Sequence, residues 1–306
     1  MDVGIVISLC VCHNFDMEIS KKQLGAVAQS LGFADIRYAS AADLPDKKGL
    51  QQPQALLPGA ACIVVLFAPY HPALPSEPGS MALSAYYIAS NRSYHAARAV
   101  AEYLQQQGAK SLHTDAVSAK SAALRTGGFL GDNGFYYHPV LGSHSCIQTV
   151  LTDAFEPEEA LAQEGGCLHC GACAAACPSH AVGDIEGCLR YHSNGLVPEA
   201  LRGDVYQLLG CERCQDACPL NNTQRSRPVS FTLKELLGGN ATKTLRELAG
   251  PNMARRGRIL SQTALYAAVT KQYELRSLLK QLAENEAEPV AAHARWAIER
   301  LNGANQ

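Results

Sequence analysis

The residues of this chain best suited to chemistry are cysteines. The stretch CLHCGACAAACPSHAV, residues 167–182, places four cysteines in eleven positions, and a proline follows the fourth. Two-residue spacers let a tight loop direct three thiolates at three corners of one [4Fe-4S] cube, and the three-residue spacer turns the fourth thiolate towards a second cube. The spacing therefore predicts two iron–sulfur clusters.

A second group of cysteines supplies the remaining ligands. Cys211, Cys214 and Cys218 lie in CERCQDACP, and Cys188 lies between the two groups. Eight thiolates serve two cubes with none left over. We predict a first set on one cluster, Cys167, Cys170, Cys173 and Cys218, and a second set on the other, Cys177, Cys188, Cys211 and Cys214.

Structural zinc is the alternative for these cysteines. Paired C-x2-C elements fit tetrahedral zinc sites, but zinc does not require the C-x2-C-x2-C-x3-C-P run of a bacterial ferredoxin. We therefore expect residues 161–224 to form a ferredoxin-type double [4Fe-4S] module. The chain continues well beyond this module on both sides, so the clusters are expected to serve a larger site.

The remaining four cysteines are scattered, and buried structural thiols are the default interpretation for them. They are Cys10, Cys12, Cys62 and Cys146. Clustered cysteines in a large chain without a clear signal peptide indicate metal ligands in a reducing compartment, so we expect a cytoplasmic protein. The apolar segment 3–12 lacks a basic flank and the length needed to span a bilayer, which predicts a buried strand or a misassigned start and no membrane contact.

Composition and charge describe an ordinary globular protein with an uneven charge distribution. The length of 306 residues allows two or three structural units. Of these residues 47% are hydrophobic and 18% are charged, as in an ordinary globular protein. The net charge of −2 argues against strong polyanion binding by the whole chain. Residues 221–306, however, hold 13 Lys+Arg against 7 Asp+Glu, a charge of +6, which leaves −8 for the remainder. The tail alone is therefore suited to nucleic acid.

Hydrophobic patterning predicts an N-terminal domain over residues 1–160 that mixes helices and strands. Helices are expected over 18–32 and 84–107, and a strand buried on both faces over 61–70. Further on, residues 134–153 predict two strands joined through a proline and a glycine. The alternation indicates an α+β or α/β fold.

The C-terminal residues 225–306 predict an all-α tail of paired, HEAT-like helical repeats. Only about two pairs fit, so the tail must pack on the rest of the protein to be stable. The predicted helices lie near 231–249, 254–269, 273–284 and 289–302.

This order of domains, together with several motifs, resembles the epoxyqueuosine reductase family, which is related to reductive dehalogenases. The motifs are GCLRYHSNG, LGCERCQDACPLN, RRGRILSQTALYAA and EPVAAHARWAIERL. The resemblance implies an oxidoreductase that converts epoxyqueuosine to queuosine in tRNA. It also implies an N-terminal domain that holds cobalamin, whose cobalt the nearer cluster reduces, and an electron donor such as flavodoxin or ferredoxin.

The resemblance also points to individual residues. Asp115 stands where the family has its proton-donating aspartate, although the distance to Gly131 is about three residues shorter than expected. An alternative role for Asp115 is the N-cap of the helix that follows. Tyr94 and His95 match a Tyr-His pair of the family. The expected cobalamin-binding residues are Tyr94, His95, Gly128, Gly131 and Asn133.

The glycine-rich turn GGFLGDNG follows a predicted helix and precedes a strand, which is the wrong order for a Rossmann phosphate loop. We interpret it as a turn where backbone must approach closely. Within it Asp132 replaces the family's lysine, Leu50 stands near an expected arginine, and Ser93 replaces an aspartate. These departures keep two alternatives open: a corrin-dependent reductase of a small molecule, and an electron-transfer protein that has lost cobalamin binding.

Histidines and arginines complete the candidates. An imidazole could ligate cobalt or donate a proton near neutral pH, and a guanidinium could contact tRNA phosphate. The histidines are His71, His95, His138 and His144. The arginines are Arg225, Arg227, Arg255, Arg256 and Arg258, all in the basic tail.

Overall fold

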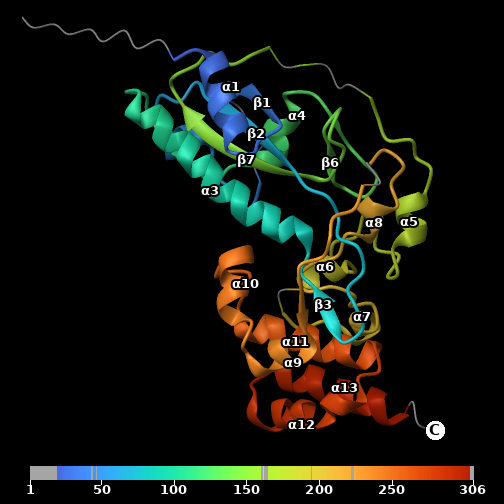
Figure 1. The fold of residues 1–306 in the computed structure, drawn as a ribbon. Coiled ribbons are helices and arrows are strands. Elements are labelled where there is room, and N and C mark those ends of the chain that lie inside the picture. The colour runs from blue at the N-terminus through green and yellow to red at the C-terminus, as the bar shows by residue number, and fades with distance from the viewer. Residues whose placement is uncertain are drawn as a thin grey trace, which may run out of the picture.

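The computed structural model describes residues 19–42, 44–45, 47–159, 161, 165–193, 195–221 and 224–303. The strand expected over 3–12, with Cys10 and Cys12, lies outside these residues. A sheet-containing domain forms one end of the molecule, the helical tail forms the other, and the cysteine loops lie between them (Figure 1). None of the described helices combines the length and the hydropathy that crossing a bilayer requires.

The N-terminal domain is built on a four-stranded sheet in the order β1-β2-β7-β4. Every neighbouring pair in it is antiparallel, so the fold is α+β and the parallel α/β alternative is wrong. Seven of the eight residues of β2 are buried, which confirms the strand predicted to have no solvent face. The strands are β1 (Asp35–Ser40), β2 (Cys62–Pro69), β4 (Ser111–His113) and β7 (Ser145–Thr152).

Helices cover both faces of this sheet. Val64 and Leu66 of β2 pack on α1 (Lys21–Ser30) and α3 (Ala85–Gln106), which confirms the two long helices expected there. Alternate β2 residues, such as Phe67, pack with the short α4 (Ala119–Leu124) on the opposite face. A further short helix, α2 (Pro53–Leu56), lies before β2.

The two strands expected over 134–153 form, but they do not pair with each other. β6 (Tyr136–Tyr137) pairs with β5 (Phe129–Leu130) to make a small hairpin, and β7 joins the main sheet. The segment between β6 and β7 closes on itself through an isolated bridge of His138 with Gly142, which separates the two strands. The glycine-rich turn is therefore a hairpin turn.

The cysteine module has little regular structure. Its short helices are α5 (Ala172–Ala176), α6 (Leu189–His192), α7 (Glu199–Arg202) and α8 (Arg213–Asp216). Each has four or five residues, so loops and turns set the positions of the thiols.

The tail differs from the prediction at its start. The single helix expected over 231–249 is a strand, β8 (Ser230–Thr232), and two helices, because Gly239 adopts a left-handed conformation that ends the first helix. β8 pairs with β3 (Ser80–Ala82) of the N-terminal domain. The helical elements are α9 (Leu233–Gly238), α10 (Thr242–Ala249), α11 (Arg256–Val269), the 3-10 turn η1 (Tyr273–Leu275), α12 (Arg276–Asn285) and α13 (Val290–Gly303).

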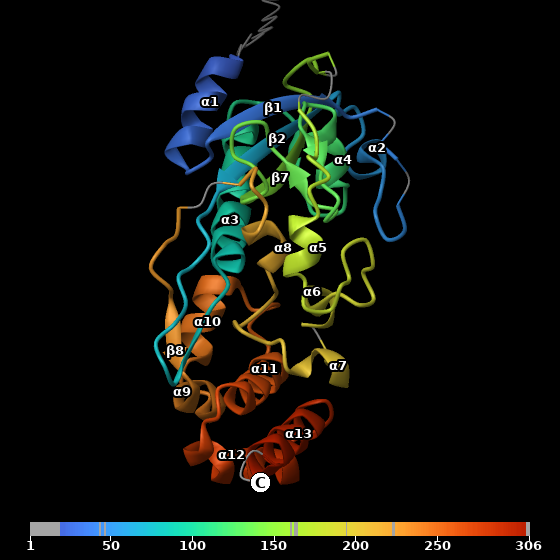
Figure 2. The same ribbon diagram turned by 90° about the vertical axis from the view of Figure 1, so that its right-hand side faces the viewer.

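The tail shares one hydrophobic core with the cysteine module, as expected for so few helices. Leu208 and Leu209 of the module are buried with Leu260 and Leu265 of α11, and Met81 of β3 belongs to the same core. In Figure 2, α11 lies at about the level of α7, and α12 and α13 lie below it. The HEAT-like character of these helices stays a prediction.

Two polar side chains of the tail also bind the module. Gln262 of α11 accepts a hydrogen bond from the Leu209 amide (2.6 Å) and donates one to the Ser193 carbonyl (2.7 Å). His293 of α13, fully buried, accepts a hydrogen bond from the Val197 amide at Nε2 (3.0 Å). Burial lowers the pKa of His293 to about 4, so its imidazole is neutral at neutral pH.

We expect His293 to make folding stability depend on pH. Below about pH 6.5 the unfolded chain binds a proton at this histidine and the folded chain does not, so stability falls towards pH 4, by about 3 kcal/mol at most. His293→Gln should remove this loss. In urea unfolding, the difference in free energy of unfolding between the wild type and His293→Gln should therefore be smaller at pH 5 than at pH 7.

The matched control is His95→Gln, because His95 is exposed. It should follow the pH dependence of the wild type. An equal stability difference between wild type and His293→Gln at both pH values would contradict the prediction.

Candidate iron–sulfur site and adjacent cleft

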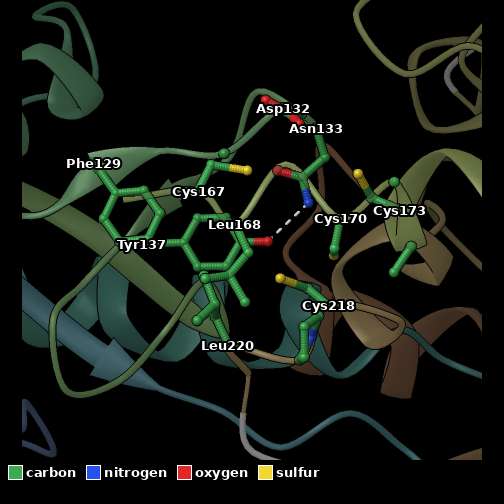
Figure 3. Close-up of a pocket in the computed structure, with 14 residues that line it drawn as sticks. Phe129, Asp132, Asn133, Tyr137, Cys167, Leu168, Cys170, Cys173, Cys218 and Leu220 are labelled. Carbon is green, nitrogen blue, oxygen red and sulfur yellow. Dashed lines mark hydrogen bonds between the residues drawn. The ribbon is translucent and has the colours of Figure 1, made fainter. Parts of the chain in front are cut away.

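The first set of cysteines surrounds one cavity. Cys167, Cys170, Cys173 and Cys218 all line a hollow with about 350 Å³ of empty space, part of it open to solvent (Figure 3). Cys170 is the exposed member of the set. Gly171 precedes α5 with a left-handed φ of 72°, which lets the chain turn between the second and third cysteines.

The second set gathers beside α8. Burial and, after it, the neighbouring thiols of Cys211, Cys188 and Cys177 raise the pKa of Cys214 to about 12. Cys173 of the first set adds to the same effect, so the two sets are adjacent. Burial and the neighbouring thiols disfavour the Cys214 thiolate, and iron would supply the positive charge that such a thiolate needs. The donor set therefore fits the predicted clusters.

Tyr137 connects the hairpin to the first set. Its hydroxyl accepts a hydrogen bond from the Asn133 amide (2.9 Å) and interacts with the Cys218 side chain. Its ring stacks on Phe129 with 5.2 Å between ring centroids. Burial raises the pKa of Tyr137 well above its usual value, so the hydroxyl keeps its proton and can donate it to sulfur. Sequence patterning did not single out Tyr137, because β6 gave no sign of facing cysteines.

Two of the predicted glycines allow the hairpin to approach Tyr137. A Cβ on Gly131 would lie 2.6 Å from the Tyr137 ring, and a Cβ on Gly128 would lie 2.4 Å from the Tyr137 carbonyl oxygen. This confirms a turn that needs close backbone approach. Gly131 and Asn133 line the cavity of the first set, whereas Gly128 does not. Cobalamin binding by these three residues stays a prediction.

Asp132 has a partner that sequence analysis missed. Its carboxylate lies 2.9 Å from Nδ1 of His169, which stands between two cysteines of the first set. Asp132, Cys167 and His169 could each offer one ligand atom within 4.8 Å of the others. Asp132 and His169 are exposed, so they mark the outer face of the first set.

A large cleft adjoins the second set. It contains about 1,560 Å³ of empty space, including open solvent, between the start of α3, α4, the β5–β6 hairpin and α6. Cys188 brings the second set to its wall, and Asn133 lines both this cleft and the cavity of the first set. Other lining residues are Tyr86, Tyr87, Lys120, Phe135, Tyr136 and Arg190.

Tyr94 and His95 do not line this cleft. They are exposed on α3, where the Tyr94 ring contacts His113 at 4.6 Å between ring centroids. Tyr87, seven residues before Tyr94 on the same helix, lines the cleft. Because seven residues of α-helix span about 10 Å, Tyr94 lies about that far along the helix from the cleft. Their role in cofactor binding stays a prediction that this arrangement does not support.

Asp115 is exposed in the bend before α4 and is not among the residues that line the cleft. The N-cap of α4 is Ser118, whose side chain accepts a hydrogen bond from the Ser121 amide. The alternative role of Asp115 as an N-cap is therefore wrong. The helix itself does reach the cleft, through Ala119 and Lys120.

The candidate histidines do not line the cleft either. His138 is buried and paired with Asp35 (2.8 Å), and His144 is buried and paired with Asp216 (3.4 Å). His71 and His95 are exposed elsewhere on the surface. A role for any of the four at a cobalt ion stays a prediction.

Ion pairs within the protein occupy some of the candidate arginines. Arg225 pairs with Asp216 (2.9 Å) and Arg256 pairs with Glu286 (2.6 Å). Arg227 and Arg255 are exposed and form no ion pair with a described residue. These last two are therefore the arginines of the predicted clusters with the most freedom to meet phosphate.

In sequence, the chain is similar to epoxyqueuosine reductases, although no model of a known protein family matches it. It is 29% identical over 215 residues to the enzyme of Staphylococcus aureus, covering 62% of this chain and 55% of the relative. It is 30% identical over 205 residues to the enzyme of Synechococcus strain CC9605, covering 59% of this chain and 61% of the relative. The chain thus spans less than two thirds of the length of either relative.

Solved structures show the same likeness. Epoxyqueuosine reductase from Bacillus subtilis, with its catalytic loop swung out of the active site, superposes with a TM-score of 0.73 at 21% identity, over 92% of this chain and 90% of that one. An epoxyqueuosine reductase with an epoxyqueuosine-modified tRNA stem loop gives the same values. The Streptococcus thermophilus enzyme gives 0.74 at 19% identity, with the same coverage. The resemblance predicted from the motifs is confirmed, and the chain has the epoxyqueuosine reductase fold.

If the first set holds the predicted [4Fe-4S] cluster, we expect Tyr137→Phe to lower its reduction potential. The variant loses a hydroxyl donor near Cys218, and one hydrogen bond of about 1 kcal/mol corresponds to roughly 40 mV for a one-electron couple. A redox titration followed by electron paramagnetic resonance would measure the change. Tyr136→Phe is the matched control, because its hydroxyl donates to the Gly127 carbonyl instead (2.9 Å). Equal potentials in wild type and Tyr137→Phe would contradict this role.

Proposed function

We propose that this chain is an iron–sulfur oxidoreductase that reduces epoxyqueuosine to queuosine in tRNA, with two [4Fe-4S] clusters and cobalamin as cofactors. The observation that carries the proposal is a large cleft whose wall contains a cysteine of the second set, in a chain with the epoxyqueuosine reductase fold. The tRNA substrate follows from similarity to reductases, one of them solved with a modified tRNA stem loop.

The cleft is suited to a corrin. The volume of about 670 Å³ that is open to water-sized molecules lies within the roughly 300–1,000 Å³ typical of small-ligand pockets. Aromatic side chains of Tyr86, Phe135 and Tyr136 offer flat apolar surface, and Asn133 and Ser143 offer polar atoms for the edge of the ring. Cobalamin bound there would supply a cobalt ion that exchanges electrons with the second cluster and with the substrate.

The exposure of the cysteines suggests a direction for electron flow. Cys170 of the first set is exposed, so a donor such as flavodoxin or ferredoxin could approach that set from solvent. Cys188 of the second set lies in the wall of the cleft, and the two sets are adjacent. The chain would thus hold the first cluster at the surface and the second beside the substrate.

Asp115 is the proposed proton donor. It lies on the loop that leads into α4, five residues before Lys120, which lines the cleft. The proposal requires this loop to carry the carboxyl group into the cleft when substrate binds. The Bacillus subtilis structure with its catalytic loop swung out shows that a relative can hold such a loop outside its active site.

The test is activity of the reconstituted protein. With both clusters and cobalamin in place and under reducing conditions, we expect conversion of an epoxyqueuosine-containing anticodon stem loop. Asp115→Asn should reduce the rate by about 100-fold or more, the usual contribution of a general acid. Glu77→Gln, which changes an exposed carboxylate elsewhere, should retain full activity.

The same preparation separates the alternatives. A protein that binds cobalamin but reduces only small molecules would be a corrin-dependent reductase of another substrate. A protein with intact clusters that fails to change the cobalamin spectrum on titration would be an electron-transfer protein. Either result would overturn the proposed function.

We expect the exposed tail arginines to contribute to RNA binding. Arg227→Gln and Arg255→Gln should each weaken binding of the stem loop and reduce its dependence on salt by about one phosphate contact. Arg256→Gln is the matched control, since Glu286 already neutralises that guanidinium. Binding affinity measured across a range of salt concentrations would show the difference. Identical salt dependence in all three variants and the wild type would exclude this surface.

A further inference from the structure

Arg190 is a cation in the cleft that the proposed reaction does not use. It lies on α6, two residues after Cys188, and lines the cleft. Its guanidinium lies over the Tyr86 ring, 4.2 Å from the ring centroid, and 5.4 Å from the centroid of Phe135. These contacts with aromatic rings fix the guanidinium between the start of α3 and the β5–β6 hairpin.

This guanidinium has no anionic partner among the described residues. No carboxylate oxygen lies within the 4.0 Å of an ion pair, and no described residue accepts a hydrogen bond from its nitrogens. The nearby buried Glu212 acts on Arg190 only at longer range, and its carboxylate accepts hydrogen bonds from Ser84 (3.3 Å) and Gln207 (3.2 Å). Stacking on aromatic rings leaves the edge of the guanidinium, with its donors, free for a ligand.

The charges around the cleft favour an anion. Lys120 supplies a second cation on the opposite wall, where its ammonium donates to the Gly134 carbonyl (2.7 Å). Asp184 is the one carboxylate among the described residues that line the cleft, and it is exposed. The charged side chains that line the cleft are therefore two cations and one exposed carboxylate, which leaves a net positive lining for an anionic group of a ligand.

We propose that Arg190 is an oxyanion-binding residue of the cleft, which holds a phosphate or carboxylate group of the ligand through paired guanidinium hydrogen bonds. The planar fork of arginine matches both groups, and the partly buried setting strengthens such a contact. The oxyanion has two possible sources, a phosphodiester of the RNA substrate or the phosphodiester of cobalamin. Only this choice of source rests on the proposed function.

The first test uses inorganic phosphate and acetate as probes on the cluster-containing protein. Calorimetric titration should show phosphate binding that Arg190→Gln weakens about tenfold or more, as expected for loss of a charge-assisted hydrogen bond. Arg190→Lys, which keeps the charge and loses the fork, should fall between them. Arg98→Gln is the matched control, because this exposed guanidinium of α3 pairs with Glu102 instead.

Because Arg190 is close to Cys188, iron content is measured in each variant. If Arg190→Gln loses iron, Arg190→Lys replaces it in the comparison, with the same expected direction. Phosphate and acetate affinities equal to those of the wild type in iron-replete variants would overturn the inference.

The second test identifies the source of the oxyanion. Weaker cobalamin binding by Arg190→Gln, with unchanged affinity for the stem loop, would assign the contact to the cofactor. A raised KM for the stem loop, with unchanged cobalamin binding, would assign it to RNA. Arg190-dependent phosphate binding in a protein that fails to reduce epoxyqueuosine would sustain the inference while the proposed function fails. Normal reduction of the stem loop, together with no effect of Arg190→Gln on the binding of any probe, would sustain the proposed function and overturn the inference.

Discussion

The crowding of cysteine thiols in a few short loops is the constraint on which the rest of the structure depends. The thiols of the second set are half-buried near one another, and burial together with the neighbouring thiols raises the pKa of Cys214. Bringing ionised thiolates this close together costs free energy, and binding of metal cations offsets that cost. Because the helices here have only four or five residues, the module cannot hold this arrangement by its own secondary structure. Neighbouring domains must frame it.

That frame comes from both sides. On one side the β5–β6 hairpin places Tyr137 beside the first set of cysteines. Gly128 and Gly131 allow the hairpin backbone to lie close to Tyr137. On the other side the tail shares its apolar core with the module, and Gln262 and His293 bind backbone groups of the module that helices and strands leave unpaired. The antiparallel sheet contributes indirectly, by fixing the start of α3 and the position of the hairpin.

The sequence was sufficient where local chemistry decides structure. Uninterrupted apolar patterning predicted β2 and α3, and the four cysteines grouped by their spacing as the first set line one cavity. It was insufficient where tertiary packing decides. Pairing of β6 with β5 depends on a non-local choice of partner, and the break at Gly239 depends on a single left-handed residue. Tyr94 lies outside the cleft because α3 extends past the end of the cleft. The absence of an ion-pair partner for Arg190 among the described residues becomes visible only in the folded structure.

Asn133 belongs to two walls at once, and this has a thermodynamic consequence. Its side chain lines the large cleft, and its amide donates to Tyr137, whose hydroxyl meets Cys218. A ligand that reorients Asn133 from the side of the cleft would change the polarity around the first set of cysteines. If this set holds a cluster, then by reciprocity the oxidation state of that cluster would change the affinity of the cleft for the ligand by the same free energy. In a chain that holds such a cluster, ligand occupancy of the cleft and the oxidation state of the cluster would be linked through one amide side chain.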